Sequence, residues 1–316
     1  MTTQDAGSPA EELAWRRYRA WAMTARKLKA KYQQAYTWVG VLALLGAIAG
    51  IIAQQLVLPD DSILGWNLGW ANRAVAVVSV LCVTASTYMG KQLLGTERET
   101  QWVQARGIAE AIKSQLYLFW MRADPYQVSA TDEASPEKRL LDKVAELEQV
   151  GVQLPRREPT SAEKSTPPAR SSMTIENYLK FRIQNQIDFY RAQVRNHQTR
   201  LAAFQRVGFV LGLIGTLMGV FGASESGTKV VAWVAVVSTA AMGLTSFATA
   251  GRHQYIITTY RAAADRLEYL TGVWSSTGKT PEDQRRFVID AEATLRAENA
   301  AWLVEQSTPV SPPAVK

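Results

Sequence analysis

The sequence predicts an all-α membrane protein with two tandem transmembrane hairpins of two helices each. Long heptad-patterned helices flank the hairpins and are expected to form a cytoplasmic bundle. Three observations support this fold class. Long apolar runs lack charges, apolar seams with alternating steps of three and four residues adjoin these runs, and the same order of elements occurs twice.

The clearest hairpin lies in the second half of the chain. Arg206 and Glu225 enclose about 18 residues without a charge, and Lys229 and Arg252 enclose about 22 more, each enough to cross a bilayer as a helix. A charge at the bilayer centre costs roughly 2.5–3.5 kcal/mol, so a run that keeps its charges at both ends indicates a span. The predicted spans are about 207–224 and 230–251, joined by a tight turn.

The first half carries a second pair of candidate spans, at about 36–58 and 74–90. Tyr36 and Trp38 stand where interface aromatics are expected. Gly46 begins a GxxxG step, which allows two helices to approach closely. The second run is short, so its ends are expected to rely on flanking basic side chains that reach the interface.

Apolar seams run along the helices before and after each hairpin and predict the core of the bundle. His197 falls on one of these seams. We interpret it as a hydrogen-bonded bundle histidine, with a metal ligand or a pH switch as alternatives. The seam residues expected to be buried are Trp21, Trp102, Ile112, Ile187, Tyr190, Leu201, Tyr260, Leu267 and Trp274.

The repeated order of elements predicts three parts in the chain. A first two-span unit covers 11–126, and a second unit with a C-terminal helix covers 173–306. Between them, 127–172 is rich in Ser, Thr, Pro and Glu and is predicted to be a flexible linker. One short helical patch interrupts this linker around 140–147.

Composition favours a few spans with sizeable water-exposed parts. The 316 residues have a formal net charge of +7, and the mean hydropathy is slightly negative at −0.11. The basic residues cluster beside the spans rather than in a nucleic-acid motif, so they predict topology and no nucleic-acid partner. We therefore expect a multi-pass inner-membrane protein. By the positive-inside rule, its two termini, the linker and the bundle lie in the cytoplasm.

The sequence lacks the usual signatures of catalysis and cofactor binding. One cysteine, Cys82, and two histidines exclude a disulfide framework and a histidine- or cysteine-rich metal site. There is no Walker loop, GxSxG elbow or HExxH motif, and the predicted spans contain no Asp or Glu. We therefore expect no catalytic residues, no metal, no cofactor and no enzymatic activity.

Two span faces could line a narrow wet path through an oligomer. The alternative is that their hydroxyl groups bond to their own helix or to a neighbouring helix. Four spans are too few to enclose a pore in one chain, so the pore hypothesis implies a homo-oligomer in the lipid bilayer. The candidate pore-lining residues are Ser79, Cys82, Ser86, Ser238, Met242, Thr245 and Thr249.

The second half resembles the SLATT domains, the SMODS- and SLOG-associating two-transmembrane effector domains. The resemblance is carried by YLKFRIQNQIDFYRAQVRNHQTRLAAFQRVGFVLGLIG, the hairpin after it, YRAAADRLEYLTGVW and FVIDAEATLRAENAAW. The first half, with WVQARGIAEAIKSQLYLFW after its hairpin, resembles a second, diverged copy. This resemblance implies a pore-forming membrane effector of a bacterial defence system, activated by a nucleotide-derived signal.

Two hypotheses for the function follow. The first is an oligomeric bacterial inner-membrane effector that permeabilises the membrane when a sensor protein or a cyclic nucleotide triggers it. The second is a non-conducting membrane scaffold whose cytoplasmic bundle recruits a partner. Charges placed at bundle residues would abolish the function of the scaffold, whereas polar changes on the span faces would not.

Overall fold

The structure, a computed structural model, describes residues 8–55, 62–63, 66–67, 69–93, 96–127, 134–156, 173–222, 228–250, 252–277 and 280–307. In these residues the chain is helical apart from turns and one short antiparallel pair, β1 (Ser62–Ile63) with β2 (Trp66–Asn67). The predicted all-α membrane fold is confirmed.

The chain divides into two compact units, and each takes segments from both halves of the sequence. The bundle unit comprises 1–30, 96–196 and 255–316, and the span unit comprises 31–95 and 197–254. The compact units therefore cut across the two sequence units predicted at 11–126 and 173–306.

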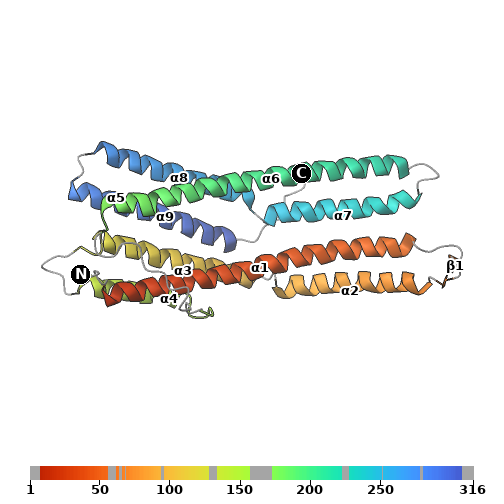
Figure 1. Ribbon diagram of the computed structural model, residues 1–316, viewed down its shortest axis with the longest axis horizontal. Helices are drawn as coiled ribbons and strands as arrows, with labels where there is room; N and C mark the ends of the chain where they lie inside the picture. Colours follow the sequence, from red (N-terminus) through yellow and green to blue (C-terminus); the bar gives the residue numbers. More distant parts are fainter. Residues whose placement is uncertain are drawn as a thin grey trace, which may run out of the picture. The chain divides into compact units, whose positions relative to one another are not determined.

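The span unit contains two helical hairpins. The C-terminal part of α1 (Pro9–Gln55) lies beside α2 (Gly69–Leu93), and the C-terminal part of α6 (Asn185–Gly222) lies beside α7 (Thr228–Ala250) (Figure 1). The described residues of the four predicted spans fall within these helices. Residues 56–58, 223–224 and 251 of the predicted spans lie outside the described residues.

Three of the described helical stretches are long and apolar enough to cross a membrane: Pro9–Gln54, Trp70–Leu93 and Ile175–Gly222. In α7 the apolar stretch with described side chains is shorter, Trp233–Thr245. Many large apolar side chains on these helices are exposed, Phe209 at 73% and Val80 at 64% among them. Such a surface is unfavourable in water and suits the hydrocarbon of a bilayer, so this is a membrane protein.

The bundle unit combines the N-terminal part of α1 with the helices that flank the hairpins. These are α3 (Thr96–Trp120), α4 (Pro136–Gln149), α5 (Ile175–Tyr178), the π-helical turn η2 (Leu179–Gln184), the start of α6, α8 (His253–Ser276) and α9 (Pro281–Ser307). Helix α3 packs against both α4 and α9. Its side chains Ile112 and Leu116 are fully buried, each contributing roughly 1.5–3 kcal/mol relative to exposure.

Part of the predicted linker at 127–172 is an ordered helix. Residues 134–156 form α4 and the turns after it, because the chain offers both a start signal and an apolar stripe. The Ser135 side chain caps the helix by accepting from the Lys138 backbone N–H, and Pro136 follows at the first helical position. Leu140 and Val144, one turn apart, are buried against the bundle. Residues 157–172 lie outside the described residues.

Local signals set two further helix ends. Thr280 caps α9: its hydroxyl accepts from the Asp283 N–H, and the Asp283 carboxylate accepts from the Thr280 N–H. Helix α3 ends at Trp120, ahead of Pro125. Arg122 adopts a left-handed conformation with φ 47°, and the Ala123 N–H donates to the Leu118 carbonyl at 2.9 Å, which closes the helix.

The turn after α4 requires a glycine. A Cβ at Gly151 would lie 2.5 Å from both Ile108 Cδ1 and Trp21 Cη2, and both of these side chains are buried. We predict that Gly151→Ala lowers the free energy of unfolding by about 1–3 kcal/mol, because the bundle must shift to admit the methyl group. Thermal unfolding in detergent, followed by circular dichroism, measures the change.

Gly272→Ala is the matched control. Nothing in the described chain lies within 4 Å of a Cβ at Gly272, which is inside α8. Alanine is about 0.5–1 kcal/mol more favourable than glycine in a helix, so this variant should unfold at a higher temperature. Equal effects of the two substitutions would contradict the tight packing around Gly151.

Candidate functional site: a buried ion-pair network and the membrane spans

The structure places most of the predicted seam residues in the core of the bundle unit. Leu201 is the exception, since it belongs to the span unit and is half-buried. The buried members are Trp21, Trp102, Ile112, Ile187, Tyr190, Tyr260, Leu267 and Trp274.

A buried ion pair lies among these apolar residues. Arg182 in η2 and Glu292 in α9 are 2% and 0% exposed. The guanidinium donates twice to the carboxylate, from Nε to Oε1 and from Nη2 to Oε2, each at 2.9 Å. The Tyr178 hydroxyl donates to the same Oε1 at 3.1 Å. The bidentate geometry and the third donor compensate for the loss of water around both charges.

Groups from α3 complete the surroundings of Arg182. The Tyr117 ring lies 4.8 Å from the guanidinium carbon, and Glu110 Oε2 lies 3.9 Å from Nη1. Burial raises the pKa of Tyr117 to about 12, so its hydroxyl stays protonated. Burial alone would lower the pKa of Arg182, but the Glu292 and Glu110 carboxylates raise it above its usual range. Arg182 therefore remains a cation at every physiological pH.

A second polar cluster lies further along the same helices. Tyr190 in α6 donates to Glu298 Oε2 in α9 at 3.1 Å, and Arg106 Nη2 in α3 donates to the Tyr260 hydroxyl in α8 at 3.3 Å. Arg106 Nη2 is 4.0 Å from Glu298 Oε1, which accepts no hydrogen bond in the described chain. Burial raises the pKa of Glu298, in spite of the nearby Arg106 cation.

The two clusters join α3, the α5–η2–α6 helix, α8 and α9 through charge-assisted and tyrosine hydrogen bonds. Sequence reasoning missed them. Glu292 follows Val288 by one helical turn on an apolar face, and Arg182 directly precedes the buried Ile183, one turn before the seam residue Ile187. Charges inside a seam were the available signal, but nothing in the sequence pairs Arg182 with a residue 110 positions away.

This arrangement suits a network that specifies one helix packing. Each buried cation faces a carboxylate or tyrosine hydroxyl, and no cluster of three or more metal-ligating side chains occurs in the described residues. Buried ion pairs contribute little net stability, yet breaking one is costly. A helix packing that pairs the charges is therefore much lower in free energy than a packing that leaves one of them unpaired.

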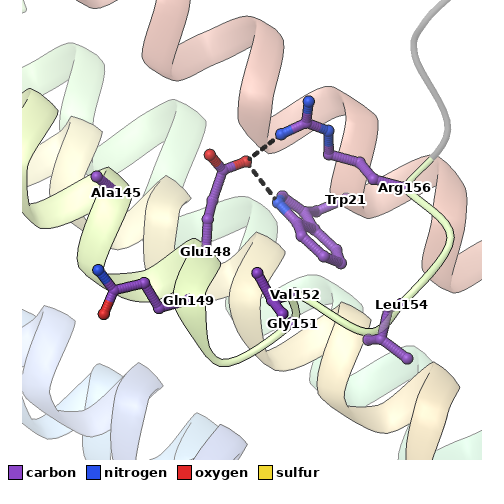
Figure 2. Close-up of a pocket in the computed structure, with 8 residues that line it drawn as sticks. All are labelled: Trp21, Ala145, Glu148, Gln149, Gly151, Val152, Leu154 and Arg156. Atoms are coloured by element: carbon purple, nitrogen blue, oxygen red, sulfur yellow. Dashed lines mark hydrogen bonds and ion pairs between the residues drawn. The ribbon is translucent and has the colours of Figure 1, made fainter.

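A further polar corner connects α1 to the end of α4 (Figure 2). The Glu148 carboxylate accepts from the Trp21 indole at 2.8 Å and from Arg156 at 3.0 Å, and Arg17 lies 3.7 Å away. An open cavity of about 600 Å³ adjoins it, lined by the end of α4, the residues after it and Trp21. Because Glu148 accepts two hydrogen bonds and faces a third side chain, the cationic Arg17, this corner fixes the end of α4 on α1.

In the first hairpin, the candidate pore-lining face of α2 packs on α1. The Ser79 hydroxyl donates to the Gly46 carbonyl at 2.7 Å, and the Ser86 hydroxyl donates to the Val39 carbonyl at 2.9 Å. A Cβ at Gly46 would lie 3.3 Å from Cys82 Cβ and 2.7 Å from Val83 Cγ2. The GxxxG step thus permits close contact, and these hydroxyls bond to the neighbouring helix as the alternative prediction describes.

In the second hairpin, the candidate face of α7 is open. Met242 is 64% exposed, Ser238 is also exposed, and the exposed Thr245 donates to the Ala241 carbonyl of its own helix. Nothing in the described chain lies within 4 Å of a Cβ at Gly243. The Thr249 side chain lies outside the described residues. This face is available to lipid or to another protein surface, and its role as a pore lining stays a prediction.

These features define a membrane protein of helical hairpins with a polar network buried in its flanking bundle. Residues 178–302 match the family described as SMODS and SLOG-associating 2TM effector domain 1 (SLATT_1). Residues 19–134 match a family described as a protein of unknown function (DUF4231).

Each match covers less than half of the chain, so it describes a similarity of that part alone. The predicted SLATT resemblance is confirmed for the second half, whereas the first half matches a different family, so two tandem SLATT copies are not established. The comparisons found no similar curated protein and no similar solved structure.

The ion pair gives a direct prediction for stability. Arg182→Met leaves Glu292 as a buried anion, and Glu292→Leu leaves Arg182 as a buried cation, so each should lower the free energy of unfolding by about 3–5 kcal/mol. The double variant should lose much less than the sum, because neither charge is stranded. Denaturant unfolding in detergent measures this cycle.

An exposed pair on α9 is the control. Arg285 and Glu282 form an ion pair at the surface, so Arg285→Met and Glu282→Leu should each change the free energy of unfolding by less than about 1 kcal/mol. Additive losses at Arg182 and Glu292 would show that the two charges do not depend on each other.

Proposed function

We propose that this protein is a non-enzymatic, oligomeric effector of a bacterial inner membrane that permeabilises the membrane when activated. Its bundle holds the spans in a closed arrangement, and a signal repacks the bundle. The termini and the bundle lie in the cytoplasm, as the basic residues beside the spans indicate. The likeness of residues 178–302 to a 2TM effector domain supports the class of function.

The observation that carries this proposal is helix continuity. Helix α1 runs without a break from Pro9 to Gln55, and the helix Ile175–Gly222 likewise includes both the Arg182 turn and an apolar span. A change in how these helices pack in the bundle is therefore passed covalently to their apolar segments. Packed helices switch between discrete arrangements rather than deforming continuously, which suits an on–off effector.

The contrast between the two hairpins supports assembly through the second one. The first is closed by the Gly46 contact and two serine hydrogen bonds, whereas no described atom lies within 4 Å of a Cβ at Gly212, Gly219 or Gly243 of the second. Small residues on open span faces allow close approach of further helices. Several copies would then supply the helices that a single chain lacks for enclosing a path.

The trigger we propose is a nucleotide-derived signal, delivered by a sensor protein or by a cyclic nucleotide itself. The support is the printed family description, which names SMODS and SLOG association. The sequence offers no recognised nucleotide-binding motif, which favours a partner as the sensor.

A scaffold remains the second candidate, supported by apolar groups on the surface of the bundle unit. Phe181 and Phe189 are exposed by 42% and 41%, and Tyr269 by 61%. Exposed aromatic side chains are typical of protein-binding surfaces. A scaffold predicts an intact membrane in every condition, which separates it from the effector.

The test uses purified protein in liposomes loaded with a fluorescent dye, with its mass measured in detergent. We expect a particle larger than one chain and leakage above that of protein-free vesicles, increasing when cyclic nucleotides or the sensor partner are added. A membrane that stays tight in all these conditions would favour the scaffold.

A substitution on the open face of α7 tests the path itself. If Met242 faces water in the assembly, Met242→Asp should insert normally and shift leakage toward cations over anions. Phe209→Asp on α6 is the control, because a carboxylate facing lipid should reduce insertion. If Met242→Asp inserts as poorly as the control, the α7 face contacts lipid and the path lies elsewhere.

A further inference from the structure

The chain has two histidines, and the fold brings them together. His197 in α6 and His253 at the start of α8 are 56 residues apart in sequence, yet their Nδ1 atoms are 2.7 Å apart. This is a hydrogen bond in which one Nδ1 carries a proton and the other accepts it. The bond fits the predicted interpretation of His197 as a hydrogen-bonded histidine.

The pair lies where both helices of the second hairpin leave the predicted spans. His197 precedes the 207–224 span, and His253 directly follows α7, which ends at Ala250. Between α7 and α8, Arg252 has φ 43°, the left-handed conformation that breaks a helix. The imidazole contact therefore ties α6 to α8 beside a break in the backbone, where a change of angle between α7 and α8 is least costly.

The surroundings of the pair are basic and apolar. His253 is 6% exposed, and the Phe204 ring of α6 lies 5.6 Å from its ring. Arg200 on α6 is the charged group that acts on His253 in the described chain, and Arg252 precedes His253 at the helix junction. The sequence has no Asp or Glu between Asp188 and Glu225 or between Lys229 and Asp265. No carboxylate on these helix segments offsets a second imidazolium.

We propose that the His197–His253 contact is a proton-operated latch that holds α6 against α8 and releases when both rings are protonated. The closed pair tolerates at most one imidazolium, because two protonated Nδ1 atoms would place N–H against N–H beside Arg200. The released pair accepts a proton on each ring. Acid therefore favours the released arrangement.

The direction of the pH effect follows from proton counts. Burial, together with Arg200, lowers the pKa of His253 below its usual value of 6.5. The released state consequently binds more protons than the closed state below about pH 6.5. The closed arrangement is fully favoured above that pH and weakens as the pH falls, with the released fraction growing by up to about tenfold per pH unit.

This latch regulates the hairpin to which the proposed function assigns assembly, and its physiological role rests on that proposal. A permeabilised inner membrane admits protons when the outside is more acidic than the cytoplasm. Protonation of the pair would then release α6 from α8 in further copies. Membrane leakage would reinforce itself.

The test measures the distance between α6 and α8 directly. Spin labels are placed at the exposed positions Gln198 and Gln254 by cysteine substitution in a Cys82→Ser background, in the full chain reconstituted in vesicles. We expect the distance distribution to shift to longer values between pH 7.5 and pH 5.5. In a His197→Gln/His253→Gln version, which cannot titrate, the distribution should be the same at both pH values.

An unchanged distribution in the native-histidine protein, or an equal shift in the double-glutamine protein, would overturn the latch. Dye leakage from the same vesicles is recorded in parallel without added nucleotide. Leakage that increases at pH 5.5 only with both histidines present supports the regulatory role. A pH-dependent distance without leakage in any condition would retain the latch and reject the proposed permeabilising function.

Discussion

The buried pair of Arg182 and Glu292 is the constraint on which the rest of the bundle depends. A guanidinium at 2% exposure can remain charged only where a carboxylate meets it, so η2 and α9 must pack in one register. Tyr178 adds a third donor to the carboxylate, and Tyr117 of α3 covers the guanidinium. Apolar contacts supply most of the stability, but they tolerate small shifts along a helix. The paired charges do not tolerate such shifts. They therefore select one helix packing from several that bury a similar apolar area.

The bilayer imposes a second constraint, which acts on the span unit. Within hydrocarbon, polar groups must find partners inside the protein, and the serine hydroxyls of α2 do so on carbonyls of α1. The first hairpin is therefore self-contained. The second hairpin leaves its α7 face open and carries the histidine contact where its helices leave the predicted spans. The two hairpins therefore differ in how much of their polar and small-residue surface is satisfied within the described chain.

Much of the fold could be predicted from the sequence, because helices and apolar segments depend on local patterns of residues. Uncharged runs predicted the apolar segments of the long helices, and heptad spacing predicted residues such as Ile112 and Tyr190, which are buried. The features that could not be predicted depend on contacts between residues far apart in the sequence. Arg182 lies beside an apolar seam, but no local pattern shows that Glu292, 110 positions away, faces it. Helix α4 was predicted only as a short helical patch at 140–147 within a linker, because the segment is polar and its buried side chains are few, Leu140 and Val144. The grouping of segments from both halves into each compact unit also lies beyond local patterns.

The central claim is that paired charges in the bundle hold the membrane segments closed. The most direct measurement compares dye leakage from vesicles containing Glu292→Gln with leakage from vesicles containing Glu146→Gln, without any trigger. Glutamine at 292 keeps the size and hydrogen bonding of the side chain but removes the charge that matches Arg182. Glu146 is exposed on α4 and pairs locally with Lys143. The account predicts raised leakage for Glu292→Gln and the unsubstituted level for Glu146→Gln. Folded, assembled Glu292→Gln protein that leaks no more than the unsubstituted protein would contradict it.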